Sequence, residues 1–283
     1  DKARLLEIQA ALIGRILPLY RKLLTEHGVE ISVSPYYHPI LPLLFDNRVA
    51  HEANPNLPLP TGLFSFPADA REQTTQAQYV FQEIFGQAPR GMWPPEGAIS
   101  DAACGLAGEL GLRWLASDEG VLLNSLRKSG QAGAVLTLQQ KLCAWQHPKG
   151  PVLFFRDHAL SDLIGFTYGR WSADEAVADF LQRLRQIYDT LPDDGQHYVV
   201  PVILDGENAW EHYPNNGADF LGLLYRRLVE APFLRTVTFS EFLDLEPHRE
   251  HLETIVAGSW IYGSLSTWVG HHEKNAAWDA LSA

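Results

Sequence analysis

The stretch YVVPVILDGE, residues 198–207, is a short apolar run that ends in carboxylates, the first of which is Asp205. Three other segments repeat this pattern: GMWPPE closes on Glu96, WLASDE includes Asp118, and PVLFFRD closes on Asp157. Apolar runs of this length, separated by helical stretches, are typical of buried parallel strands. Because residues at the C-terminal ends of parallel strands line the site in α/β proteins, acidic groups from several strands should converge on one rim.

Helical periodicity separates these apolar runs along the chain. Leucine and isoleucine recur at three- and four-residue steps from Leu5 to Leu23, which predicts a helix over residues 1–27. Further helices are expected over residues 69–85, 101–110, 173–191, 220–229 and 275–281. Core strands are expected near Ile31, Met92, Leu115, Leu153, Val202 and Val237, and residues 120–149 are less regular, with strand character in 136–146. This alternation predicts one α/β domain over residues 1–283, with a parallel sheet or barrel.

Composition limits the classes of protein to which the chain can belong. The 22 Lys and Arg against 34 Asp and Glu leave a net charge of −12, which disfavours a nucleic-acid partner because phosphates need basic groups. No apolar run approaches the ~20 residues that a membrane span requires. The hydrophobic share of 46% is compatible with a large packed core. These features predict a globular α/β domain without a membrane segment.

No motif for a metal or a cofactor is present. The adjacent His271 and His272 would point to opposite faces of an extended chain, and HExxH, GxSxG, GxGxxG and GxxxxGK[ST] are absent. Cys104 and Cys143 lie outside any CxxC pattern, so neither zinc nor a disulfide framework is expected. Reduced cysteines and the lack of a visible signal peptide favour a cytoplasmic location. The sequence therefore predicts chemistry carried by side chains alone.

Each candidate carboxylate has a catalytic and a structural interpretation. Asp205 could serve as a general acid at the end of a buried strand, or it could cap the turn that follows. Glu96 follows two prolines that stiffen the backbone, which suits a nucleophile but also suits an ordinary turn. Asp157 could hold sugar hydroxyls together with Arg156 and His158, or the three could form a buried salt-bridge network; the structural interpretation is favoured here.

Aromatic residues make carbohydrate the favoured ligand. The chain has eight Trp and ten Tyr, and Trp93, Trp210 and Trp268 lie beside polar motifs. Aromatic faces stack on sugar rings, although about half of the tryptophans are expected in the core because Trp is buried on average. Two carboxylates from different strands, with surrounding aromatic rings and no cofactor motif, are typical of glycoside hydrolysis.

Five segments in order resemble the signature regions of glycoside hydrolase family 57, the amylase, amylopullulanase and glucanotransferase group. They are SPYYHPILPLL, MWPPEGAIS, FFRDHALSDLIGF, VILDGENAWE and TWVGHHEKNAAW, which together extend over nearly the whole chain. The first signature of that family, an HQP-type motif on its first strand, is not in this chain. The resemblance implies a distorted (β/α)7 barrel that is incomplete at its N-terminus, in a chain that is a fragment of a longer protein.

The resemblance also implies a mechanism and an assignment of residues. Glu96 would be the nucleophile and Asp205 the acid/base of a retaining enzyme that acts on α-glucans. Substrate contacts would come from His38, Trp93, Asp118, Asp157, Trp210, Trp268, His271 and Glu273. The expected activity is that of an amylase or amylopullulanase. The alternatives are a 4-α-glucanotransferase, a non-catalytic carbohydrate-binding remnant of the same fold, and a carbohydrate deacetylase, which would need an Asp/His/His metal set.

Overall fold

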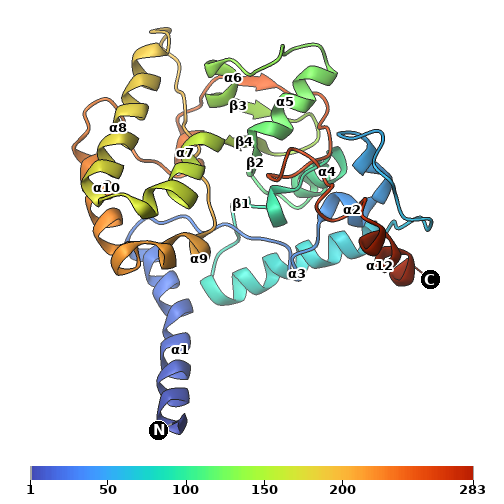
Figure 1. Ribbon diagram of the computed structural model, residues 1–283, viewed down its shortest axis with the longest axis horizontal. Helices are drawn as coiled ribbons and strands as arrows, with labels where there is room; N and C mark the ends of the chain where they lie inside the picture. Colours follow the sequence, from blue (N-terminus) through green and yellow to red (C-terminus); the bar gives the residue numbers. More distant parts are fainter. Residues whose placement is uncertain (1, 283) are drawn as a thin grey trace.

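A parallel-rich sheet forms the centre of the molecule (Figure 1). The computed structural model describes residues 2–282, without the side chains of Glu207 and Asn208. The strands follow the order β1-β2-β4-β3-β5. Their bounds are β1 Gly91–Met92, β2 Trp114–Asp118, β3 Ala144–Gln146, β4 Val152–Arg156 and β5 Arg249–His251. β1, β2 and β4 run parallel, so their C-terminal ends meet at the same edge, whereas β3 is antiparallel to β4 and parallel to β5.

Helices surround this sheet. In the described residues the α-helices are α1 Lys2–Glu26, α2 Leu41–Phe45, α3 Pro67–Phe85, α4 Asp101–Glu109, α5 Glu119–Lys128, α6 Leu138–Leu142, α7 His158–Asp162, α8 Ala173–Thr190, α9 Gly206–Ala209, α10 Ala218–Glu230, α11 Phe239–Asp244 and α12 His272–Ser282, with short 3-10 and π turns between some of them. α8 and α10 pack side by side, and α1 projects away from the body with most of its apolar side chains exposed (Figure 1). The described residues contain no helix that is both long and apolar enough to span a membrane.

The central strands β2 and β4 are buried along their whole length, and their residues are apolar except at the C-terminal ends, because both faces of the sheet are covered. Successive residues of a strand point to opposite faces. Leu115 and Phe155 accordingly pack into the large core cluster on one face, while Trp114, Ala116 and Phe154 pack into a second cluster on the other. A third cluster lies among α7, α8 and α10. The runs that predicted strands near Met92, Leu115 and Leu153 therefore form strands buried on both sides, as parallel sheets require.

Two of the predicted strands are wrong. Residues 198–204 form no strand ladder, since Pro201 has no N–H to donate at the middle of the segment. Isolated hydrogen bonds hold the segment instead: the N–H of Val199 donates to the carbonyl of Leu142 at 2.9 Å, and the carbonyl of Pro201 accepts from the N–H of Asp157 at 2.8 Å. Residues 235–238 also lie outside any strand, since Thr238 already forms the capping box of α11.

Smaller differences concern the irregular parts of the chain. The strand expected near Ile31 is a single parallel bridge between Val33 and Met92. The first part of residues 120–149, expected to be less regular, belongs to α5, for which Asp118 provides the N-cap by accepting the N–H of Gly120. Residues 136–146 form α6 and β3 rather than strands alone. The prediction of an α/β fold with a parallel-rich sheet is confirmed.

The side chain of Phe154 provides a test of the second core cluster. Phe154 is fully buried, and its ring stacks on that of Phe239 with the centroids 4.3 Å apart and the planes at 15°. We expect Phe154→Ala to lower the free energy of unfolding by about 3–5 kcal/mol, because it removes buried surface and leaves a cavity. Denaturant titration would measure this loss. The matched control is Phe166→Ala, whose ring is 78% exposed, with an expected change within about 0.5 kcal/mol; equal losses in both variants would contradict this description of the core.

Candidate active site

Glu96 lies in a tight turn shortly after β1. Residues Pro95–Gly97 form a short 3-10 turn, in which Glu96 has φ 58° and ψ 23° and Gly97 has φ 58°. A left-handed backbone is uncommon for a residue with a side chain, and such strain collects at functional sites. The Ser117 hydroxyl of β2 fixes the turn by donating to the carbonyl of Gly97 at 2.6 Å. The stiffness expected from the two prolines is thus present at this carboxylate.

Two side chains contact the Glu96 carboxylate, which is 29% exposed. The indole N–H of Trp260 donates to Oε2 at 2.9 Å, and Nε2 of His38 lies 3.3 Å from Oε1. His38 also has a positive φ, 56°. The structure therefore brings the predicted His38 to Glu96 and adds Trp260, which was not among the predicted site residues.

Aromatic rings flank this turn. The rings of Trp93 and Trp260 meet edge to face, with their centroids 5.4 Å apart. The backbone of Trp93 is tied to the segment before α2, because its carbonyl accepts from the hydroxyl of Ser34 at 2.6 Å. Both indoles are partly exposed. An aromatic surface next to a held carboxylate is the arrangement expected for binding a sugar ring.

The position of Gly97 leaves no room for a side chain. A Cβ there would lie 2.7 Å from Cη2 of Trp93, and the positive φ disfavours any other residue. We expect Gly97→Ala to cost about 1–3 kcal/mol of unfolding free energy, measured by denaturant titration. Gly133→Ala is the matched control, since its Cβ would meet nothing within 4 Å and its φ is not positive. A neutral Gly97→Ala would show that the turn is not strained as described.

Asp205 reaches the same rim from a different segment. It is partly buried, occupies the N-cap position of α9 and follows residues 198–204. The hydrogen bond between the N–H of Asp157 and the carbonyl of Pro201 places this segment beside the C-terminal end of β4. The C-terminal ends of β1, β2 and β4 share one edge, where Glu96, Asp118 and Asp157 end or follow these strands, and Asp205 follows the segment that is bonded to Asp157; a common site for the four carboxylates stays a prediction.

Asp118 and Asp157 are buried and have partners within the protein. Asp118 is 3% exposed and accepts from Nη1 of Arg156 at 3.0 Å, while Asp157 caps α7 by accepting the N–H of Leu160 at 2.8 Å. Arg156 also pairs with Asp162. The ion-pair network expected for the FFRDHALSD segment is present around Arg156 and His158, but its carboxylates are Asp118 and Asp162, and Asp157 caps α7 instead. Contacts of these two carboxylates with a ligand stay a prediction.

The predicted residues of the C-terminal part lie on other elements. Trp268 packs in a cluster that contains Trp278, whose indole N–H donates to the Trp268 carbonyl at 2.9 Å. His271 and Glu273 are exposed at the start of α12, which lies across the molecule from α9 (Figure 1). Trp210 packs against Tyr213 and other residues of the third cluster. The structure therefore brings His38 and Trp93 to Glu96 and places the remaining tryptophans partly in the core.

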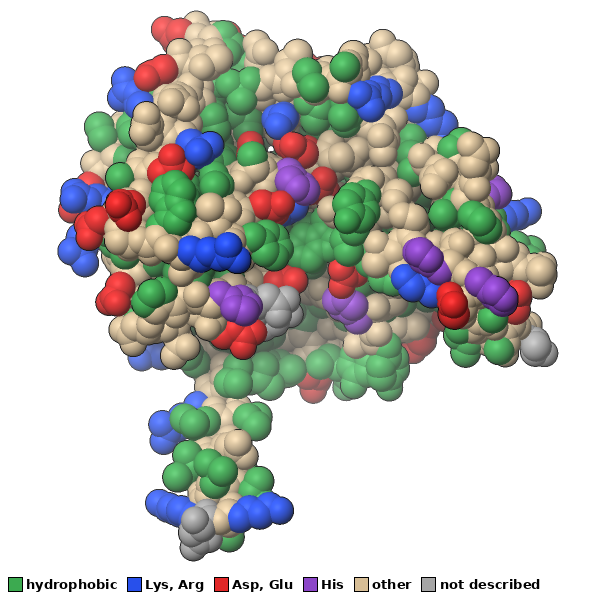
Figure 2. All heavy atoms as spheres, in the orientation of Figure 1, with side chains coloured by type: hydrophobic (Ala, Val, Ile, Leu, Met, Phe, Trp, Pro, Cys, Tyr) green, Lys and Arg blue, Asp and Glu red, His purple; other side chains and the backbone are tan. Residues whose placement is uncertain are grey.

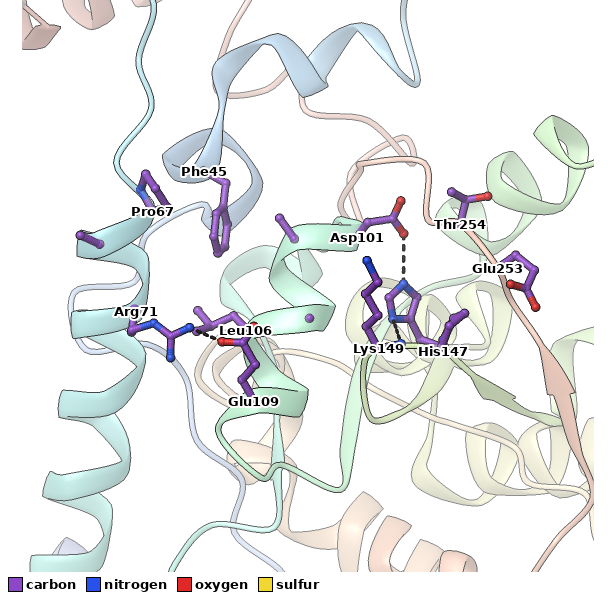
Figure 3. Close-up of a pocket in the computed structure, with 14 residues that line it drawn as sticks. Phe45, Pro67, Arg71, Asp101, Leu106, Glu109, His147, Lys149, Glu253 and Thr254 are labelled. Carbon is purple, nitrogen blue, oxygen red and sulfur yellow. Dashed lines mark hydrogen bonds and ion pairs between the residues drawn. The ribbon is translucent and has the colours of Figure 1, made fainter.

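The face that carries the rim is open. Figure 2 shows a hollow over the β1 and β2 part of the sheet, with acidic and histidine side chains around an apolar floor. A large cavity of about 810 Å³ lies elsewhere, between α3, α4 and the turn that joins β3 to β4 (Figure 3). Its polar lining includes Arg71, Asp101, His147 and Lys149, and no predicted site residue lines it. Among the described residues, no group of His, Cys, Asp and Glu is arranged to hold a metal ion.

Solved structures of similar fold extend over nearly the whole chain. A branching enzyme from Pyrococcus horikoshii matches with a TM-score of 0.71 and 19% identity, and the match covers 98% of this chain and 56% of that one. An α-amylase, AmyC, from Thermotoga maritima matches with a TM-score of 0.67 and 16% identity, over 91% of this chain and 56% of that one. A 4-α-glucanotransferase from Thermococcus litoralis matches with a TM-score of 0.64 and 17% identity, and the match covers 91% of this chain and 35% of that one. The chain thus spans about half the length of the first two proteins.

The sequence comparison gives the family directly. No curated protein matches the chain. The family model described as Glycosyl hydrolase family 57, however, matches residues 3–256, which is most of the 283 residues and includes Glu96 and Asp205. Together with the agreement in fold, this match shows that the chain belongs to glycosyl hydrolase family 57.

Proposed function

We propose that this chain is a retaining glycosidase of the amylase or amylopullulanase type, with α-glucans as its substrates. The observation that carries the proposal is the Glu96 carboxylate, which a strained turn presents beside an aromatic wall on the same rim as Asp205. Family membership supports the substrate class, and the solved structures of similar fold are described as a branching enzyme, an amylase and a glucanotransferase.

The proposed reaction proceeds by double displacement. In the first step, a Glu96 oxygen attacks the anomeric carbon while Asp205 donates its proton to the leaving oxygen, which leaves a glycosyl ester on Glu96 and a free alcohol. In the second step, the Asp205 carboxylate takes a proton from water or a sugar hydroxyl, whose oxygen attacks the anomeric carbon and releases Glu96. Two inversions give net retention. The mechanism requires the two carboxyl groups to lie about 5–5.5 Å apart in the substrate complex.

The other predicted residues receive distinct roles in this proposal. Trp93 and His38 would bind the sugar at the cleavage point, since they lie next to Glu96. Trp210, Trp268, His271 and Glu273 would contact more distant sugar units. Asp118 and Asp157 would act indirectly, because both are buried and hold α5 and α7 at the rim.

Transfer to an acceptor sugar is the second candidate function. Two of the similar structures are of transferring enzymes, a branching enzyme and a 4-α-glucanotransferase. Hydrolysis and transfer would share the glycosyl-Glu96 intermediate and differ only in whether water or a sugar hydroxyl attacks it.

Product analysis on maltooligosaccharides and pullulan tests the proposal. Hydrolysis gives only shorter oligosaccharides, transfer gives longer ones as well, and a branching reaction gives new α-1,6 linkages. Cleavage of pullulan would identify the amylopullulanase type. Absence of any reaction on these substrates would contradict the proposed activity and favour a non-catalytic carbohydrate-binding protein.

A further inference from the structure

Trp260 contacts the Glu96 residue through both its side chain and its backbone. The indole N–H donates to Oε2 at 2.9 Å, and the backbone N–H donates to the carbonyl oxygen of Glu96 at 3.1 Å. The segment that carries Trp260 is fixed two residues earlier by the antiparallel bridge between Gly258 and Ile99. A residue 164 positions away in the sequence is thus attached to the turn of the proposed nucleophile.

Arg156 supports the indole from the sheet. Its guanidinium carbon lies 5.4 Å from the centroid of the Trp260 ring, in the geometry of a cation–π contact. The same guanidinium is buried and bonded to Asp118 at 3.0 Å and, through Nε, to the carbonyl of Ile203 at 3.0 Å. Ile203 precedes Asp205 by only two positions. One arginine therefore contacts both the tryptophan that holds Glu96 and the segment that leads to Asp205.

The chemistry of the indole suits this place. An indole N–H is a donor only and does not titrate, so it can orient a carboxylate without competing for the proton of that group. A hydrogen bond to Oε2 restricts rotation of the carboxylate, which keeps the attacking oxygen in one geometry. The other carboxylate oxygen, Oε1, faces Nε2 of His38.

We propose that Trp260 is a positioning residue for Glu96 and that Arg156 holds Trp260 in place. The inference rests on the proposed function, in which Glu96 attacks the sugar. Trp260 acts on the nucleophile rather than as a platform for the substrate ring. The distinction is testable, since phenylalanine keeps an aromatic face but has no N–H.

Trp260→Phe should lower kcat on maltooligosaccharides by about 10- to 100-fold, the range expected for a lost hydrogen bond to a charged group. KM should stay within about twofold, because the lost bond acts on the reacting carboxylate and not on ground-state binding. A raised KM with unchanged kcat would overturn the inference and assign Trp260 to substrate stacking. An unchanged kcat and KM would overturn it as well.

Trp114→Phe is the matched control. The indole N–H of Trp114 also donates to a glutamate, Oε1 of Glu30 at 3.0 Å, but at the N-terminal end of β2, away from the rim. The Trp114→Phe variant loses the same type of hydrogen bond, so it should be less stable than the wild type but keep the same kcat. An equal fall of kcat in both variants would show a general structural effect and overturn the positioning role.

A second measurement does not depend on activity. The indole N–H resonance of Trp260, assigned by its loss in Trp260→Phe, should move in Glu96→Gln, whereas the Trp114 resonance should not. An unmoved Trp260 resonance would overturn the contact and with it the inference. If the wild-type chain has no activity on α-glucans, the proposed function fails, while this resonance still decides whether Trp260 holds Glu96.

Discussion

Replacing Glu96 with glutamine should reduce turnover of maltooligosaccharides by about 10⁴-fold or more, because the amide cannot form the glycosyl ester. The side chain keeps its size and its neighbours, so the thermal midpoint should stay within about 2 °C. Release of reducing ends and a melting curve on the same preparation measure both quantities.

Glu119→Gln is the matched control for this variant. Glu119 also follows a buried strand, but it lies in the first turn of α5 and pairs with Lys141 at 2.8 Å. The turnover of the Glu119→Gln variant should remain near that of the wild type. Near-normal turnover in Glu96→Gln itself would exclude Glu96 as the nucleophile.

Replacing Asp205 with alanine should have an effect that depends on the leaving group. On maltooligosaccharides the loss should be about 10²- to 10⁴-fold, the usual contribution of a general acid. On an α-glucosyl fluoride, whose leaving group needs little protonation, the first step should survive. The glycosyl ester should then accumulate, because no base activates water for the second step.

Added azide separates the roles of the two carboxylates. In Asp205→Ala, azide should restore turnover on the fluoride and give an α-glycosyl azide, since it attacks the glycosyl ester without a base. Asp219→Ala, an exposed carboxylate in the first turn of α10, should behave like the wild type. Equal losses on both substrates with no response to azide would contradict the acid/base assignment.

The parts of the fold that the sequence predicts well are those governed by local pattern. The runs around Met92, Leu115 and Leu153 form strands that are buried on both faces. A strand buried on both faces has a continuous apolar sequence, so such a run predicts this kind of strand. The run at residues 198–204 is similarly apolar, but Pro201 removes a ladder donor, and the apolar side chains of the run pack half-buried against two core clusters without forming a strand. Apolar character predicts burial more directly than it predicts hydrogen bonding.

At the candidate site, too, local sequence patterns predict less about contacts between distant segments than about single residues. Glu96 and His38 each lie in a motif with an informative local sequence, and the structure places them 3.3 Å apart, while their roles stay predictions. The contact of Trp260 with Glu96 could not be predicted, since it joins distant segments and the local sequence GSW resembles an ordinary loop. The signal available was its position shortly before the TWVGHHEKNAAW motif. The salt bridges of Arg156 were anticipated only in outline, because pairing depends on three-dimensional placement.

Covalent trapping tests the central claim most directly. A fluorinated α-glycosyl fluoride slows the second step more than the first, so the glycosyl-enzyme accumulates and can be digested and examined by mass spectrometry. The proposed mechanism predicts a single sugar adduct on the peptide that contains Glu96, absent in Glu96→Gln. An adduct on a different carboxylate, or turnover with inverted products and no adduct, would contradict it.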